Sequence, residues 1–314
     1  GWSDVVATDY FVRDLYRSLQ GIISYPFSTF RRLEVGASAT FLRQDEIWRG
    51  TNFTRGEALD ETIRIFDAKY VEPTAALVFD NSLFGWTGPI AGRRYRIQAS
   101  RTIGDFEYAE GLVDFRNYWN YKRKVVLATR LLSLTRIGGN ADTFFLYWGG
   151  PYFLRGYDRD SFDPQSGECN RDFGARSYSP CPAADQLIGS SAAIFNAELR
   201  FPIITELQIG FLGNFPPVDA VIFFDGGLAW SDRVCAGAAF FSIEGCDDTP
   251  SEDVKLVWKR EPGQDPFVYR APLFSYGFGL RINIFYTVLR LDYAFPISRP
   301  DRSGRFSISF GPSF

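Results

Sequence analysis

Histidine and methionine are absent from the 314 residues of this chain. Without histidine there is no Ser-His-Asp or Cys-His nucleophile pair, no HExxH zinc helix and no imidazole proton shuttle. Serine is plentiful, but no GxSxG elbow accompanies it. We therefore expect a chain that is not an enzyme, with no catalytic residues, no cofactor and no bound metal ion.

Long hydrophobic runs and an excess of positive charge are missing as well. The densest apolar runs, such as residues 221–224, are about four residues long, whereas a membrane-spanning helix needs roughly 18. The 34 Lys and Arg side chains are balanced by 37 Asp and Glu, which gives a formal net charge of −3. This balance provides no electrostatic footprint for nucleic acid, so we expect no nucleic-acid partner.

Apolar and polar residues alternate along many segments of the chain. Residues 33–41, 194–201, 276–284 and 289–293 each place apolar side chains on one face and polar or small ones on the other. This period of two is typical of a transmembrane β-barrel strand, although a soluble two-sheet protein with one wet face also alternates. Two features favour the barrel. Small residues accompany Arg and Asp on the polar faces, and tryptophans stand near strand boundaries at positions 48, 86, 119, 148 and 230.

The alternation and the turn signals together predict about eleven strands. Their approximate spans are 13–25, 31–43, 67–80, 90–103, 109–119, 122–136, 188–201, 218–230, 273–284, 287–297 and 304–314, with 207–212 as a further short candidate. Tight turns alternate with long loops at 137–187 and 231–270, as in outer-membrane barrels. The predicted fold class is all-β, a transmembrane antiparallel β-barrel with about 11–12 strands in this chain.

The N-terminal part of this layout is less regular. Residues 1–12 are expected to be the tail of an external loop, so that the barrel occupies residues 13–314. Residues 57–66 carry apolar side chains at helical spacing and are expected to form a short helix in a loop. A lipid-exposed sheet edge would leave backbone groups unsatisfied, which predicts that further strands precede these.

Several segments carry a resemblance to a known family. Residues 149–157 (GGPYFLRGY), 196–202 (NAELRFP), 223–230 (FFDGGLAW) and 276–296 occur in this order with the spacing of a barrel. They resemble the lid-loop motif and wall strands of the BamA-type assembly and translocation barrel superfamily, the bacterial surface antigen family. The resemblance implies that the chain is the C-terminal part of a barrel of roughly 16 strands.

A subgroup of that superfamily carries a TolB-like propeller before its barrel, and other members carry POTRA repeats. Residues 16–34 and 88–97 look most like the propeller subgroup. The resemblance therefore implies an upstream POTRA or propeller domain, or a partner chain.

The resemblance also implies a particular contact inside the barrel. The lid loop would be residues 137–187, with Leu154, Arg155, Gly156 and Tyr157 as its motif. In the family the lid arginine pairs with an acid on the wall, which here matches Asp225. The alternation of residues 222–230 independently turns Asp225 inward, and Glu198 is a second inward candidate. A guanidinium forked onto a carboxylate would anchor a loop that is costly to order.

The last residues alternate and finish on an aromatic side chain. Phe306, Ile308 and Phe310 share one face, and Phe314 ends the sequence. This pattern resembles the assembly signal of bacterial outer-membrane barrels.

Four cysteines lie in the two long loops, Cys169 with Cys181 and Cys235 with Cys246. Four cysteines allow three connectivities, and two local disulfides are the simplest arrangement in an oxidising compartment. A metal site is the alternative, but no CxxC spacing and no histidine support it.

Two functions follow for a chain in the bacterial outer membrane, surrounded by its lipid. The first is insertion or translocation of unfolded outer-membrane or secreted proteins by pairing with a free sheet edge. The second is a non-catalytic anchor or pore for an upstream, propeller-like domain.

Overall fold

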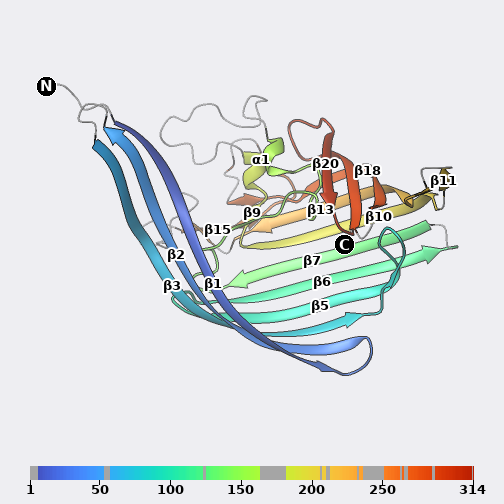
Figure 1. Cartoon of the computed structure of the whole chain (residues 1–314), viewed down its shortest axis with the longest axis horizontal. Coiled ribbons are helices and arrows are strands. Elements are labelled where there is room, and N and C mark those ends of the chain that lie inside the picture. Colours follow the sequence, from blue (N-terminus) through green and yellow to red (C-terminus); the bar gives the residue numbers. More distant parts are fainter. Residues whose placement is uncertain are drawn as a thin grey trace.

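The computed structural model describes residues 6–52, 57–122, 125–162, 182–205, 207–209, 213–231, 233–235, 251–261, 264, 268–284, 287–312 and 314. Within them, one large antiparallel sheet dominates (Figure 1). Its strands are β1 (Val6–Pro26), β2 (Arg31–Asn52), β3 (Glu57–Asp80), β5 (Pro89–Gly104), β6 (Tyr108–Tyr121), β7 (Val125–Ile137), β10 (Ser191–Ile204), β13 (Val218–Trp230), β18 (Leu273–Ile284), β19 (Thr287–Pro296) and β20 (Arg305–Phe310). They pair in that order, and β4 (Leu83–Phe84) adds to β5.

The remaining elements are short and lie in the connections. β8 (Leu146–Tyr147) pairs with β9 (Ile188–Gly189), β11 (Leu207–Ile209) with β12 (Gly213–Phe215), β14 (Arg233–Cys235) with β15 (Ser251–Asp253), and β16 (Lys255–Leu256) with β17 (Tyr269–Arg270). A 3-10 turn, η1 (Arg159–Ser161), and a four-residue helix, α1 (Pro182–Asp185), complete the set. No helix among the described residues is both long and apolar enough to cross a membrane.

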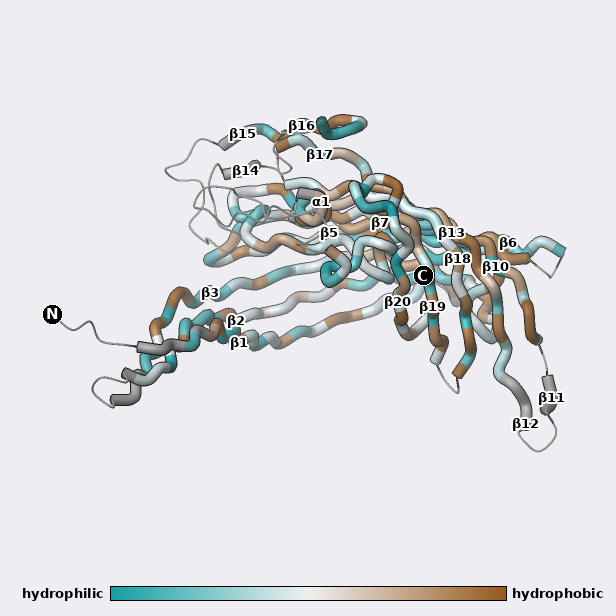
Figure 2. The backbone as a smooth tube through the Cα atoms, turned by 90° about the horizontal axis from the view of Figure 1, so that it is seen from above, coloured by the Kyte–Doolittle hydropathy of each residue, from teal (hydrophilic) through white to brown (hydrophobic). Residues whose placement is uncertain are grey.

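The two faces of the sheet have opposite chemistry. Figure 2 shows short hydrophobic and hydrophilic patches alternating along the strands. Large apolar side chains point outward, with Leu19 80% and Ile23 79% exposed, while Glu198, Asp225 and Arg281 are completely buried on the inner face. A soluble protein has the reverse arrangement. Apolar outside and charged inside is the pattern of a barrel wall in lipid.

The predicted strands and the observed sheet agree closely. Each of the eleven predicted spans corresponds to one strand of the sheet order, so the predicted all-β class and the strand number are confirmed. The further candidate at 207–212 is partly β11, which belongs to a separate hairpin.

The N-terminal region differs from its prediction in two places. Residues 6–12 are not a loop tail, because β1 already begins at Val6 and pairs with β2 as far as Asn52. Residues 57–66 are not a helix but the first part of β3. A β-bulge explains the misreading: Gln44 pairs with Phe66 and Asp45 with Arg64, so one residue is inserted and the period of two is broken there.

The strands differ in length. β1, β2 and β3 have 21, 22 and 24 residues, whereas crossing a membrane takes about 9–11. Together they form an arm that rises beyond the rim formed by the other strands (Figure 1). At the two ends of the strand order, β1 and β20 each pair on one side only among the described strands.

Candidate functional site

The connection between β7 and β10 folds back against the inner face of the sheet. Near its tip, Gly150 donates to the carbonyl of Leu154 (3.0 Å) and closes a tight loop. Leu154 and Tyr157 are completely buried, and Arg155 is 2% exposed. This is the segment that the sequence predicts as a lid loop, and the structure places its motif deep among the strands.

Arg155 lies between two carboxylates of the wall. Its Nε and Nη2 donate to Asp225 Oδ2 and Oδ1, both at 2.6 Å, and its Nη1 donates to Glu198 Oε1 at 2.5 Å. The guanidinium also lies over the ring of Phe223, with Cζ 3.6 Å from the centroid. Burial lowers the pKa of Arg155, but Asp225 and Glu198 outweigh that effect and raise it above its ordinary value. The structure thus brings Arg155 together with both predicted acids.

Neighbouring strands extend this contact into a network. Glu198 also accepts from Arg200 Nε and Arg281 Nη2, both at 3.0 Å, and Arg281 Nη1 donates to Asp292 Oδ1 at 2.8 Å. Asn196 sits opposite Asp225 in the β10–β13 register. We call Arg155, Asp225 and Glu198 the lid lock. The lid lock joins the loop to β10 and β13, and Arg281 and Asp292 extend the network to β18 and β19.

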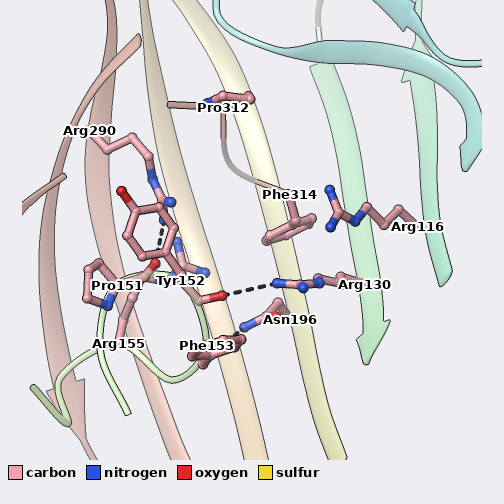
Figure 3. Close-up of a pocket in the computed structure, with 10 residues that line it drawn as sticks. All are labelled: Arg116, Arg130, Pro151, Tyr152, Phe153, Arg155, Asn196, Arg290, Pro312 and Phe314. Carbon is pink, nitrogen blue, oxygen red and sulfur yellow. Dashed lines mark hydrogen bonds between the residues drawn. The ribbon is translucent and has the colours of Figure 1, made fainter. Parts of the chain in front are cut away.

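A small cavity of about 250 Å³ lies between the lid tip and the wall (Figure 3). Here the wall donates to three successive lid carbonyls: Arg290 Nη2 to Pro151 (2.8 Å), Arg130 Nη1 to Tyr152 (3.0 Å) and Asn196 Nδ2 to Phe153 (2.7 Å). The lid backbone is thereby held by three different strands. Sequence reasoning missed these contacts, because an inward arginine on a strand does not reveal which loop carbonyl it meets.

The lid tip also contacts the last strand of the sheet. Tyr152 donates its hydroxyl to the carbonyl of Phe310, the last residue of β20, at 2.8 Å. One side of β20 has no strand partner among the described strands. A single hydrogen bond therefore links the lid directly to a free sheet edge.

Gly156 and Tyr157 fix the loop beyond the lock. Gly156 has φ +83°, a conformation that favours glycine, and an added Cβ would lie 3.1 Å from the Cβ of Ala294. Tyr157 donates to the carbonyl of Phe274 (2.9 Å), and burial raises its pKa to about 12. Arg299, in the loop after β19, donates from Nη1 to the carbonyl of Gly156 at 3.0 Å. Sequence reasoning did not single out Arg299.

The opposite rim of the sheet is covered by the turn between β3 and β5. Arg200 Nη1 donates to the carbonyl of Pro89 at 3.1 Å, Asn283 donates to the carbonyl of Trp86, and Thr87 donates to Asp219. The same wall strands therefore hold a loop from each rim.

The residues of the predicted assembly signal divide into two groups. Phe306, Ile308 and Phe310 are more than half exposed on the outer face of β20. The chain then bends at Gly311, where φ is +104°. Phe314 lines the cavity behind the lid, and its ring centroid lies 5.9 Å from Arg200 Cζ. Phe314 thus lies apart from the other three.

The predicted disulfides cannot be placed. Cys169, Cys181 and Cys246 lie outside the described residues, and only the backbone of Cys235 is described, in β14. The two pairings stay predictions.

Comparisons with known proteins agree with this architecture. The profile of the Omp85 superfamily domain matches residues 80–314. The structure of BamA from Haemophilus ducreyi lacking POTRA domains 1–3 superposes with a TM-score of 0.58 at 16% identity, over 95% of this chain and 54% of that one. CdiB from Acinetobacter baumannii superposes with a TM-score of 0.50 at 14% identity, over 97% of this chain and 42% of that one. The chain thus spans about half the length of these proteins, and the likeness to them is one of fold.

Proposed function

Because the chain belongs to the Omp85 superfamily, whose barrels are non-catalytic proteins of the bacterial outer membrane, we propose that it helps to insert or translocate other proteins there. In this proposal, unfolded outer-membrane or secreted proteins are the substrates. An extended substrate segment pairs with a free strand edge, where main-chain hydrogen bonds provide affinity.

The observation that carries the proposal is that the same lid contacts both the wall strands and the free edge of the sheet. Arg155 holds the lid on β10 and β13, and Tyr152 of the same lid contacts the end of β20. A substrate strand that displaces Tyr152 from Phe310 would loosen the lid, and release of Arg155 would free the edge. In the resting state the lid would therefore restrain the edge strand β20, and binding of a substrate at that edge would loosen the lid.

Conditional depletion of the protein tests this function. We expect the amounts of several other outer-membrane barrels to fall, measured by quantitative mass spectrometry of purified outer membranes. Re-expression of the wild-type protein should restore them, and re-expression of Arg155→Ala should not.

Arg94→Ala is the matched control for this experiment. Arg94 pairs loosely with Asp80, at 3.6 Å, and makes none of the lid contacts described above. We expect it to complement depletion fully. Unchanged amounts of all other barrels after depletion would contradict insertion and would favour a second proposal, an anchor or pore for an upstream propeller-like or POTRA domain. The likeness of residues 16–34 and 88–97 to the propeller subgroup supports that alternative.

A further inference from the structure

The outer face of the arm carries a groove that is distinct from the lid. It has a volume of about 580 Å³ and crosses β1, β2, β3 and β5. One register row across its floor is apolar: Leu19 pairs with Ala39, Ala39 with Val71, and Val71 with Ile103. The next row contains Arg17, Phe41 and Lys69. Apolar and basic side chains therefore meet in one groove.

The depth in the membrane at which the apolar row gives way to the basic row follows from the opposite end of the same strands. There Arg31 pairs with Phe79, and the rings of Phe79 and Tyr95 stack at 5.2 Å, as expected for an interfacial aromatic girdle. From Arg31 to Phe41 along β2 is about 33 Å at roughly 3.3 Å per residue. With a strand tilt of about 45°, this corresponds to about 23 Å, close to the roughly 25 Å apolar band of such barrels. Arg17 and Lys69 therefore stand at the headgroup level of one leaflet.

That leaflet is the external one. The short turn after β1, at residues 27–30, lies at the rim opposite the lid, and long loops mark the external side of these barrels. The N-terminal end of β1 lies at the other rim, the one that carries the lid (Figure 1).

The two basic side chains that line the groove are not neutralised by ion pairs among the described residues. Arg17 and Lys69 are both exposed, and neither belongs to an ion pair among the described residues. The Nζ of Lys69 lies 5.9 Å from the ring centroid of Phe41, which holds it beside the apolar floor. Farther along the arm, Arg13 and Arg43 share one acid, Asp45. Asp67 pairs with Arg43 in the strand register, and Asp105 Oδ2 accepts from the backbone N–H of Lys69 at 2.7 Å. Four basic side chains therefore stand beside three acids, and the polar end of the groove keeps a small net positive charge.

We propose that this groove binds a phosphorylated glycolipid of the external leaflet, with acyl chains on the Leu19 to Ile103 row and phosphates at Arg17 and Lys69. Several cations beside one apolar floor fit a lipid that carries more than one phosphate. The inference rests on the membrane location of the barrel and does not require the proposed insertion function.

Native mass spectrometry of the full-length protein, titrated with bisphosphorylated lipid A in detergent, tests the site. We expect wild type to bind one lipid A, and the Arg17→Ala/Lys69→Ala variant to bind it about tenfold more weakly, because two charge-assisted contacts are lost. The Arg17→Lys/Lys69→Arg variant should bind as wild type does. Both positions are exposed, so folding should be unaffected, and circular dichroism checks this.

Arg31→Ala is the matched control, since Arg31 is an exposed arginine at the other edge of the same apolar band. It should change lipid A affinity less than twofold. An equal loss in Arg31→Ala, or none in the double alanine variant, would overturn the site. Binding of phosphatidylglycerol as tight as that of lipid A would overturn the glycolipid assignment. None of these readouts depends on the insertion of other proteins.

Discussion

The C-terminal strands and the N-terminal arm share one alternating pattern but differ in what covers their inner faces. In β10, β13 and β18 the inward Glu198, Asp225 and Arg281 are completely buried beneath the lid. In β1 the inward Tyr16 is 63% exposed, and the contact between its hydroxyl and the hydroxyl of Thr40 is long, at 3.5 Å. The comparison shows that the inward charges of β10, β13 and β18 are buried where the lid covers them, whereas the inward Tyr16 of β1 is exposed.

This difference has an energetic consequence. Exposed ion pairs contribute about 0–1 kcal/mol, whereas removing one partner of a buried pair costs about 3–5 kcal/mol. The C-terminal region should therefore respond strongly to single substitutions of its inward charges, whereas exposed inward charges of the arm, such as Arg32, should respond weakly.

The largest effect is expected from Arg155→Ala. The substitution leaves Asp225 and Glu198 beside an empty space under the lid, so we expect lid closure to lose about 3–5 kcal/mol while the barrel stays inserted. Limited proteolysis of the lid in intact outer membranes measures this, and cleavage should become more than about a hundredfold faster. Wild-type protease resistance in this variant would show that the lock does not hold the lid.

A smaller effect is expected from Gly156→Ala. The φ of +83° disfavours a side chain by about 1–2 kcal/mol, and the added Cβ would press on Ala294. Lid cleavage should therefore accelerate about tenfold, less than in Arg155→Ala. Gly139→Ala is the control, because nothing lies within 4 Å of its added Cβ and no left-handed φ occurs there. Equal effects of both alanines would remove the backbone explanation.

Alternation predicted the wall of this site but not the loop contacts. Asp225 and Glu198 could be turned inward from the period of two alone, because strand side chains alternate strictly. The pairing of Arg155 with them came from the resemblance of its motif. Arg299 and Tyr152 were missed because each meets a partner more than 140 residues away, and loop sequences have no period that encodes such contacts. The start of β3 was misread because its bulge interrupts the period on which strand prediction depends.

Tyr152→Phe tests the link from the lid to the sheet edge. It removes one hydroxyl bond to the carbonyl of Phe310 and keeps the ring, so the expected cost is about 1 kcal/mol. The amide of Gly311, which donates to Val288, should then exchange about fivefold faster in hydrogen-exchange mass spectrometry. Tyr95→Phe, on the outer face, should leave that exchange unchanged. Exchange at Gly311 that is insensitive to Tyr152 would separate the lid from the edge.

The smallest effect is expected in the arm, from Arg32→Ala. Arg32 donates to Glu34 at 2.7 Å, but it is 44% exposed, and Glu34 keeps a second donor in Arg96 Nη1 at 2.7 Å. Loss of the Arg32 bond therefore leaves the Glu34 carboxylate paired with Arg96. We therefore expect the free energy of unfolding in urea to change by less than about 0.5 kcal/mol. A cost as large as that of Arg155→Ala would mean that exposed charges on the open inner face of the arm stabilise it as strongly as the lock stabilises the lid. The distinction between the two regions would then have to rest on something other than burial.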